Sequence, residues 1–286
     1  MQYEAPTSLD QAVALLANAR GEARVLAGGT DLLVQMRTDV VEPALLVDIK
    51  GIAELREVRE EAGGFRVGAA VTGAELKEHA ALKRAWPGVI EAANLIGSTQ
   101  VQGRATMGGN LCNGSPAADS VPALIAAGAK ASIVGPKGRR ELPVEDVMIG
   151  PRKLALEKGE IIASFLLPKK APRSADAYLR FIPRTEMDIA VAGCGVSLTL
   201  DAGGTCTAAR VGLGAVAARP LLVAEAAKAL IGTKLDDAAL ARLDAAVRAA
   251  CKPIDDKRGT IEYRTKVAGV LARRAAQIAL ERARKS

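Results

Sequence analysis

Short apolar runs alternate with helical patterns over the first 170 residues of the chain. Runs rich in β-branched and aliphatic residues predict strands at residues 24–27, 45–49, 56–59, 65–68, 131–134 and 161–167. Apolar residues at helical spacing predict helices after Ser8 and at 72–80, 88–95 and 118–127. Ser8 and Thr72 each begin a capping-box pattern, which marks the start of a helix. These segments predict a unit in which strands and helices are mixed.

The order of the predicted elements changes after a polar, proline-rich stretch at residues 168–174. Strands predicted at 178–182, 190–200 and 207–217 follow one another, and helices predicted at 220–230, 236–250 and 261–284 come after them. Strands first and helices afterwards indicate an antiparallel sheet covered by helices on one side. We therefore predict an α+β protein with two domains, residues 1–170 and 175–286.

The composition indicates a folded protein outside the membrane. The 286 residues are 49% apolar, and the apolar residues are spread along the chain, which argues against disorder. No apolar run approaches the ~20 residues that a membrane-spanning helix needs. The first residues show neither a basic start nor an apolar stretch, so no secretory signal is visible. We expect a cytoplasmic protein without a membrane span.

Cysteine spacing and charge disfavour two further classes of site. The four cysteines are far apart and His79 is the one histidine, so this chain alone is not expected to hold an iron–sulfur cluster or structural zinc. The net charge of +7 is compatible with binding to nucleic acid, with binding to an acidic partner, or with a soluble surface that binds neither. Aromatic residues are only 2% of the chain, which disfavours nucleic acid because single-strand binding relies on aromatic stacking.

Two glycine clusters carry the clearest chemical signal, Ala27-Gly28-Gly29-Thr30-Asp31-Leu32 and Ala105-Thr106-Met107-Gly108-Gly109-Asn110. Consecutive glycines let main-chain N–H groups converge on an anion, because no Cβ blocks the approach and positive φ angles cost little. A pyrophosphate would suit two such clusters, with Thr30, Thr106 and Asn110 as side-chain donors. A tight turn without a ligand is the alternative for either cluster alone.

Better-known phosphate motifs do not fit the chain. Neither cluster has the G-x-x-x-x-G-K-[ST] spacing of a nucleoside-triphosphate P-loop. The string Gly212-Leu213-Gly214-Ala215-Val216-Ala217 matches a dinucleotide fingerprint, but Pro220 follows at once. No acidic residue lies on a second predicted strand ~20 residues later, where the fingerprint requires one. We therefore expect no nucleotide at that string.

The stretch from Ile96 to Ser120 resembles the flavin-binding signature of molybdenum hydroxylase medium subunits. That family includes the flavoproteins of carbon monoxide dehydrogenase, xanthine dehydrogenase and 4-hydroxybenzoyl-CoA reductase. Residues 27–33 resemble its first flavin motif, and residues 159–162 and 184–190 are similar to its third and fourth landmarks. The resemblance implies an N-terminal FAD-binding domain of the PCMH (vanillyl-alcohol-oxidase-like) type and a C-terminal domain of the CO dehydrogenase flavoprotein type.

The resemblance also assigns contacts with FAD. Residues 27–32 and 106–110 would hold the pyrophosphate and ribityl chain. Ile96 would lie against the adenine, and Asp119 would accept a hydrogen bond from the adenosine part. Ile162 and Arg180 would lie near the isoalloxazine, where the Arg180 cation would stabilise reduced flavin as the lysine of many relatives does. The predicted cofactor site comprises Ala27, Gly28, Gly29, Thr30, Asp31, Leu32, Ile96, Gly97, Thr106, Gly108, Gly109, Asn110, Asp119, Ile162 and Arg180, with no catalytic residue and no metal.

The implied function is electron transfer within an oxidoreductase complex. A large molybdopterin subunit would convert the substrate, and a small subunit with two [2Fe–2S] clusters would exchange electrons with non-covalent FAD on this chain. The expected assembly is a dimer of heterotrimers, and the acceptor would be NAD+, a quinone or another carrier. Two alternatives stay open, a stand-alone FAD-dependent oxidase or dehydrogenase and a scaffold subunit without cofactor.

Four further residues have simpler interpretations. His79 is expected at an exposed helix end, and no covalent flavin attachment through it is expected. Cys112 is expected to pack locally as a buried thiol. Glu186 and Asp188 could form a carboxylate pair, but a surface or turn role is expected.

Overall fold

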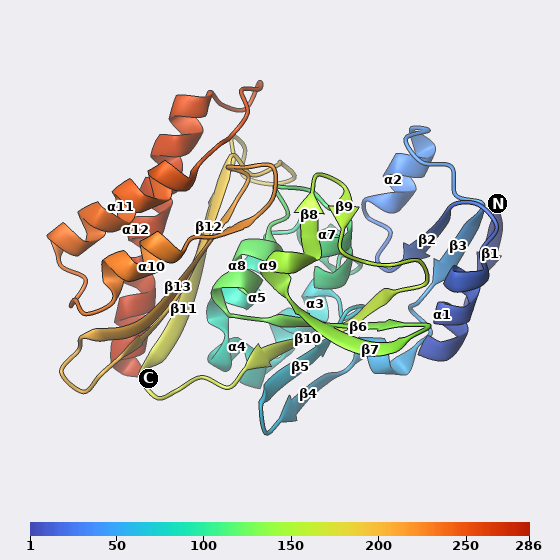
Figure 1. Ribbon diagram of the computed structural model, residues 1–286, viewed down its shortest axis with the longest axis horizontal. Helices are drawn as coiled ribbons and strands as arrows, with labels where there is room; N and C mark the ends of the chain where they lie inside the picture. The colour runs from blue at the N-terminus through green and yellow to red at the C-terminus, as the bar shows by residue number, and fades with distance from the viewer.

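The computed structural model describes residues 1–286 and arranges them as three blocks along the long axis of the molecule (Figure 1). The first block is a parallel three-stranded sheet in the order β1-β3-β2 with two helices. Its elements are β1 (Gln2–Glu4), α1 (Leu9–Asn18), β2 (Ala23–Leu26), α2 (Leu32–Arg37) and β3 (Leu45–Asp48). Ser8 begins α1 as predicted, because its side chain accepts a hydrogen bond from the main-chain N–H of Gln11.

The second block is built on a five-stranded antiparallel sheet in the order β4-β5-β10-β6-β7. Its elements are η1 (Ala53–Arg56), β4 (Val58–Glu61), β5 (Gly64–Gly68), α3 (Gly73–Glu78), α4 (Ala80–Ala85), α5 (Pro87–Ala93), α6 (Thr99–Gln102), α7 (Met107–Cys112), α8 (Ser120–Ala126), β6 (Lys130–Gly135), β7 (Gly138–Pro143), α9 (Val144–Val147), β8 (Met148–Gly150), β9 (Lys153–Leu154) and β10 (Ile161–Pro168). The predicted capping box at Thr72 is confirmed, since Thr72 and Glu75 exchange side-chain to main-chain hydrogen bonds.

Apolar side chains cover the central sheet on both faces. The largest buried cluster lies between one face and helices α3, α4, α5, α7 and α8, and it includes Trp86 and the fully buried Phe165 of β10. A separate cluster joins the other face to α1 and β3 of the first block, through residues such as Leu16 and Ala163. The late strand β10 therefore contributes to both cores and holds the first two blocks together.

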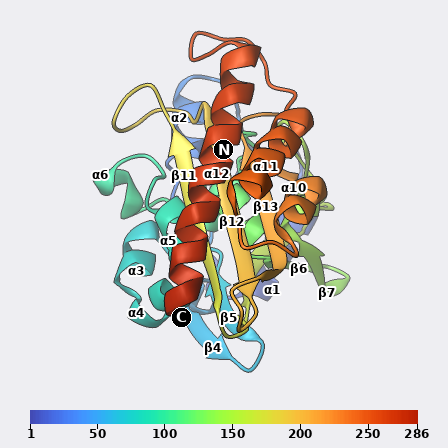
Figure 2. The same ribbon diagram turned by 90° about the vertical axis from the view of Figure 1, so that its left-hand side faces the viewer.

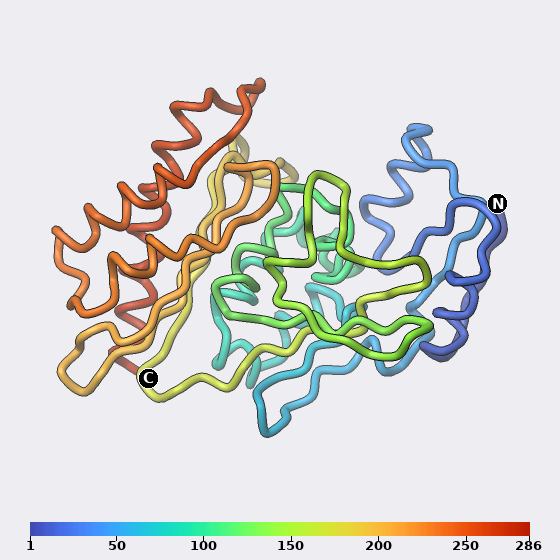
Figure 3. The backbone as a smooth tube through the Cα atoms, viewed as in Figure 1, coloured from blue at the N-terminus to red at the C-terminus, as the bar shows by residue number.

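The third block is an antiparallel sheet in the order β11-β12-β13-β14, and Figure 2 shows helices lying across its outer face. Its elements are β11 (Ser174–Phe181), β12 (Ala192–Leu200), β13 (Cys206–Gly214), β14 (Leu221–Leu222), α10 (Ala224–Leu230), α11 (Asp237–Ala250) and α12 (Ile261–Lys285). Asp236 and Thr260 cap α11 and α12 with their side chains. The chain trace places the two termini toward opposite ends of the long axis (Figure 3).

Glycines let the inner face of the third block pack directly on α8 of the second. Gly195 and Gly212 are partners in adjacent strands β12 and β13. A Cβ on Gly212 would lie 2.2 Å from the carbonyl oxygen of Pro122, and one on Gly195 would lie 2.7 Å from the same atom. The string around Gly212 and Gly214 is therefore part of a packing surface, which explains its match to a nucleotide fingerprint without a nucleotide role.

Charged side chains tie the same junction together. Asp176 at the start of β11 is 3% exposed, pairs with Lys170 at 2.5 Å and accepts a hydrogen bond from the N–H of Val89 in α5. Glu91 of α5 also pairs with Arg282 near the end of α12. A buried carboxylate with two partners is costly to disturb, because removing one partner leaves an uncompensated charge. These contacts fix the second and third blocks in one orientation.

Most predicted elements are confirmed, with shifts at their ends. The strand expected at 56–59 begins later, because residues up to Arg56 form the 3-10 turn η1. The helix expected at 220–230 begins at Ala224, since Leu221 and Leu222 first pair with β13 as β14. The antiparallel C-terminal sheet and its helices are confirmed, and its inner face is covered by α5 and α8. Short elements that the pattern did not predict are β1, β7, β8, β9, α4, α6, α7 and α9.

None of the helices combines the length and the apolar character that a membrane span requires.

Replacing Gly212 with Val should lower the free energy of unfolding by at least about 2 kcal/mol, because the new side chain would overlap the Pro122 carbonyl. Valine itself favours strands, so the loss would report packing and not strand propensity. Urea unfolding measures the change. The matched control is Gly63→Ala, where a Cβ meets nothing within 4 Å. Equal stability of Gly212→Val and wild type would contradict this account of the junction.

Candidate functional site

A cavity of about 380 Å³ lies between the first and second blocks, within the usual size range of ligand pockets. All the predicted site residues line it except Gly97, Asp119 and Arg180. The lining includes Val25, Ala27, Gly28, Gly29, Thr30, Asp31, Leu32, Ile96, Thr106, Gly108, Gly109, Asn110, Cys112, Arg152, Leu154, Leu156 and Ile162. The cavity therefore joins the two glycine clusters, which are far apart in the sequence, and adds apolar walls on both sides of them.

The first glycine cluster connects β2 to α2 and leaves its main chain free to bind a ligand. The N–H groups of residues 28–31 donate to no acceptor within the chain. Gly29 has a φ of +75°, a conformation that residues with a Cβ adopt only at a cost. A Cβ on Gly28 would lie 1.9 Å from the carbonyl oxygen of Arg104, so only glycine lets the first cluster touch the second. The predicted convergence of N–H groups thus starts from a direct contact between main chains.

The second glycine cluster forms the start of helix α7, which differs from the expected turn with positive φ angles. Thr106 caps this helix, since its hydroxyl oxygen accepts a hydrogen bond from the N–H of Gly109 at 2.9 Å. The N–H groups of Met107 and Gly108 have no acceptor within the chain. Glycine is needed at position 108 for steric reasons and not for a positive φ, because a Cβ there would lie 2.4 Å from the carbonyl oxygen of Ala69. The free N–H groups of a helix start favour an anion.

Side chains at the rim of the cavity divide into donors and structural supports. The Asn110 side-chain oxygen accepts hydrogen bonds from the N–H and hydroxyl of Ser120, at 3.0 and 2.7 Å, so its amide N–H groups are left to donate elsewhere. Thr30 has no side-chain partner in the chain, and its hydroxyl can also donate. Thr106 is 4% exposed, and its hydroxyl oxygen caps the helix as an acceptor, so its hydroxyl hydrogen is still free to donate.

The cavity fits a dinucleotide with a pyrophosphate at its centre. Segments with free N–H groups, after β2 and at the start of α7, line the same cavity, and together these groups suit a doubly charged linker. Apolar side chains such as Val25, Ile96 and Ile162 line the walls beside them and suit flat aromatic rings.

Asp119 of α8 and Arg180 of β11 form an ion pair at 2.8 Å, with side chains 11% and 5% exposed. The second carboxylate oxygen of Asp119, Oδ1, is buried and has no hydrogen-bond partner. Burial raises the pKa of Asp119 to about 6, although the Arg180 guanidinium acts in the opposite direction. The sequence assigned the two residues to opposite ends of FAD, but one ion pair places them together.

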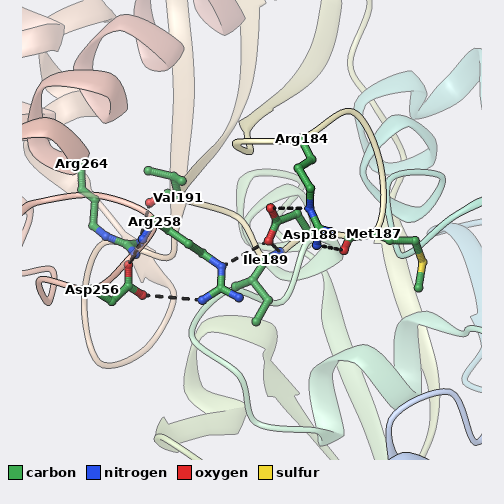
Figure 4. A network of polar contacts seen from close by, with 8 residues as sticks. All are labelled: Arg184, Met187, Asp188, Ile189, Val191, Asp256, Arg258 and Arg264. Carbon is green, nitrogen blue, oxygen red and sulfur yellow. Dashed lines mark hydrogen bonds and ion pairs between the residues drawn. The ribbon is translucent and has the colours of Figure 1, made fainter.

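Gly97 lies beside the loop between β11 and β12, which Figure 4 shows in a network of ion pairs. The N–H of Met187 in this loop is 3.5 Å from the carbonyl oxygen of Gly97. Asp188 is held by Arg184 and Arg258, each at 3.2 Å, and its side chain is only 8% exposed. Asp188 therefore anchors the loop to the segment between α11 and α12, where Arg258 lies, and does not form a carboxylate pair with Glu186.

One part of the cavity lining was not predicted from the sequence. Arg152 and Leu154 belong to the small hairpin of β8 and β9, which attaches to the second glycine segment through a hydrogen bond from Arg152 N–H to Gly114. Two strands of three and two residues are too short to produce a pattern. Cys112 was expected to pack locally as a buried thiol. Its side chain is instead accessible from the cavity that it lines, although burial still raises the pKa of its thiol to about 12.

Two family models match successive parts of the chain. Residues 1–170 match the family model for the FAD binding domain in molybdopterin dehydrogenase, and residues 177–279 match that for the CO dehydrogenase flavoprotein C-terminal domain. The carbon monoxide dehydrogenase medium chain of Afipia carboxidovorans is 38% identical, over 99% of this chain and 97% of that protein. The xanthine dehydrogenase FAD-binding subunit of Escherichia coli O157:H7 is 32% identical, over 92% of this chain and 90% of that protein.

A solved structure agrees along almost the entire chain. Reconstituted CO dehydrogenase from Oligotropha carboxidovorans matches with a TM-score of 0.95 and 37% sequence identity, covering 99% of this chain and 98% of the matched chain. At that identity and coverage the match extends from the fold to the family. This chain belongs to the FAD-binding medium subunits of the molybdenum hydroxylases.

Proposed function

We propose that the cavity between the first two blocks binds one non-covalent FAD, with the pyrophosphate on the free N–H groups of residues 28–31 and of Met107 and Gly108. The observation that carries the proposal is the contact between Gly28 and Arg104, which brings these unpaired donors together. Main-chain donors held by packing need no reorganisation when an anion binds, which favours affinity. Thr30 and Asn110 would add side-chain donors to the phosphates.

The remaining predicted site residues would hold the two ring systems. Ile96 and Ile162 both line the cavity, and each would pack on a ring as the family resemblance implies. Arg180 would supply a cation beside the flavin. Ala27, Asp31, Leu32, Gly97 and Gly109 would shape the main chain around the ligand. Bound FAD would supply the redox chemistry, since a flavin takes electrons singly and releases them singly or as a pair.

The flavin is proposed to bind without a covalent bond to the chain. His79 is half-buried at the start of α4, where its Nδ1 accepts a hydrogen bond from the N–H of Leu82 at 3.1 Å. Its ring also packs edge-on against Phe65. A histidine used as a helix cap outside the cavity lining has no route to the flavin. Acid precipitation should therefore release all the yellow colour into the supernatant, and flavin found on a peptide would contradict the assignment.

We further propose the assembly and setting in which this subunit acts. By analogy with the CO dehydrogenase that the chain resembles, a large molybdopterin subunit and a small [2Fe–2S] subunit would complete a heterotrimer, and two heterotrimers would pair. The complex would work in the cytoplasm. Residues 1–170 would be the FAD-binding domain and residues 175–286 a second domain that closes the site through Arg180.

Replacing Gly28 with Ala should weaken FAD binding by at least about 30-fold. A Cβ 1.9 Å from the Arg104 carbonyl must push the two glycine segments apart, at a cost above about 2 kcal/mol. Titration of the cofactor-free chain with FAD, followed by flavin fluorescence, measures the affinity. Gly103→Ala is the matched control, because a Cβ there would meet only the Gln100 carbonyl at 3.6 Å. A folded Gly28→Ala protein with wild-type affinity would show that the contact does not build the site.

The cofactor-free chain should lose stability as Asp119 ionises. The folded-state pKa of about 6 exceeds the ordinary value of 3.8, so the folded chain binds more protons between these values and its free energy of unfolding falls as pH rises. Asp119→Asn removes this titration. The stability of the variant relative to wild type should therefore increase between pH 4.5 and 7.5, by on the order of 1 to 3 kcal/mol. Urea unfolding at both pH values checks this, and a difference that does not change with pH would contradict it.

A further inference from the structure

A second cavity, of about 650 Å³, lies on the face of the central sheet that also packs against the first block. Its lining shares no residue with the cofactor cavity, so FAD binding does not account for it. Ala163 is the one hydrophobic residue among the eleven that line it, and charged side chains come from η1, β4, β5 and β7. The cavity has the size of a small-molecule site with a polar lining.

Small polar residues lie in the middle of this second cavity. Gly68, Ser164 and Ser132 are successive partners across the adjacent strands β5, β10 and β6. Both serines are only 6% exposed, since longer charged side chains surround them. Directly opposite residues on adjacent strands have Cβ atoms about 5 Å apart. The two hydroxyls can therefore reach the same small ligand group.

The same residues offer donors that have no acceptor within the chain. The Ser132 hydroxyl makes no hydrogen bond in the chain although the residue is buried. Ser164 accepts a hydrogen bond from Arg66 Nη1 at 3.3 Å, so its own hydroxyl hydrogen is free to donate. Arg66 is held by Glu61 at 2.8 Å through Nε, which leaves Nη2 without a partner. A buried polar group without a partner is unfavourable, so the cavity has a place for an acceptor.

Two arginines lie directly opposite each other beside these serines. Arg59 of β4 is the cross-strand partner of Arg66 on β5. Like charges in such positions are destabilising. Glu57 lies 3.5 Å from Arg59, but both side chains are about half exposed, so this ion pair offsets the repulsion only weakly. An anion bound next to Arg66 would reduce the repulsion further.

We propose that the second cavity binds a phosphate group, with Ser132, Ser164 and Arg66 as its donors. A tetrahedral oxyanion has enough acceptor oxygens for all three, and hydrogen bonds to a charged acceptor are the strong ones. Much of the remaining charge in the lining is already paired, as in the Arg139–Glu54 and Arg140–Glu160 ion pairs. The cavity therefore suits one phosphate group and not a polyanion, and its volume leaves room for the organic part of a small phosphate ester.

The test titrates the full chain loaded with FAD, so that the cofactor cavity does not contribute. Inorganic phosphate and ribose 5-phosphate are added separately at constant ionic strength, and calorimetry gives each Kd and stoichiometry. Saturable binding of one phosphate group per chain is the expected result. Tighter binding of the ester would identify a phosphate ester as the ligand, and equal or weaker binding would identify free phosphate. Absence of saturable binding by both would overturn the site.

Substitution of a serine locates the binding. Ser132→Ala should weaken the binding of phosphate by at least about 10-fold, because it removes a hydrogen bond to a charged group. Ser174→Ala is the matched control, since Ser174 lies on β11 outside both cavities with its hydroxyl 2.8 Å from that of Thr199. This control should bind phosphate as wild type does. Unchanged affinity in Ser132→Ala would place the phosphate elsewhere and overturn the proposal.

A second variant should bind more tightly, which a folding defect cannot imitate. Glu141 of β7 is the direct cross-strand partner of Ser132, so its negative charge lies next to the proposed phosphate. Glu141→Gln removes this charge and should strengthen phosphate binding by about 3-fold or more. The same calorimetric titration measures the change. Unchanged or weaker binding in Glu141→Gln would contradict a phosphate beside Ser132.

Discussion

The structure of the site depends on one close contact, that of the Gly28 main chain with the Arg104 carbonyl. It joins the turn after β2 to the segment that leads into α7, so two segments with unpaired N–H groups line the same cavity. The surrounding fold maintains this contact: the first block packs on β10 through α1, and α7 packs in the core on the other face of the same sheet. An anion site made of main-chain donors tolerates no displacement, because its geometry comes entirely from packing.

The second half of the chain would complete the site through Arg180. It supplies none of the free main-chain N–H groups that are proposed to bind the phosphates. Its sheet lies directly on α8, where glycines such as Gly212 let the strands approach Pro122. Arg180 on β11 can reach Asp119 only because the two blocks are this close, and the loop after β11 is anchored by Asp188 beside Gly97. The C-terminal domain therefore supplies one member of the Asp119–Arg180 ion pair, while the residues proposed to bind the phosphates all lie in the N-terminal part.

The sequence predicted the long elements, the capped helices and both glycine clusters, because each depends on local spacing or on a local hydrogen bond such as that of Thr72. It did not predict that the second cluster begins a helix, since Gly108 and Gly109 weaken the helical pattern that tertiary contacts impose. The Asp119–Arg180 pair and the β8–β9 hairpin were also missed. Both arise from contacts between segments distant in the chain, which no residue spacing records.

As a medium subunit, this chain is expected to relay electrons and not to convert a substrate itself. The most direct measurement expresses the chain alone, loads it with FAD, and follows both dye reduction by an artificial electron donor and oxidation of small substrates in the absence of molybdenum and iron–sulfur subunits. The account predicts dye reduction that depends on bound FAD and no oxidation of the small substrates. Multiple turnovers of a small substrate by the isolated chain would contradict it and would identify a stand-alone flavin oxidase or dehydrogenase.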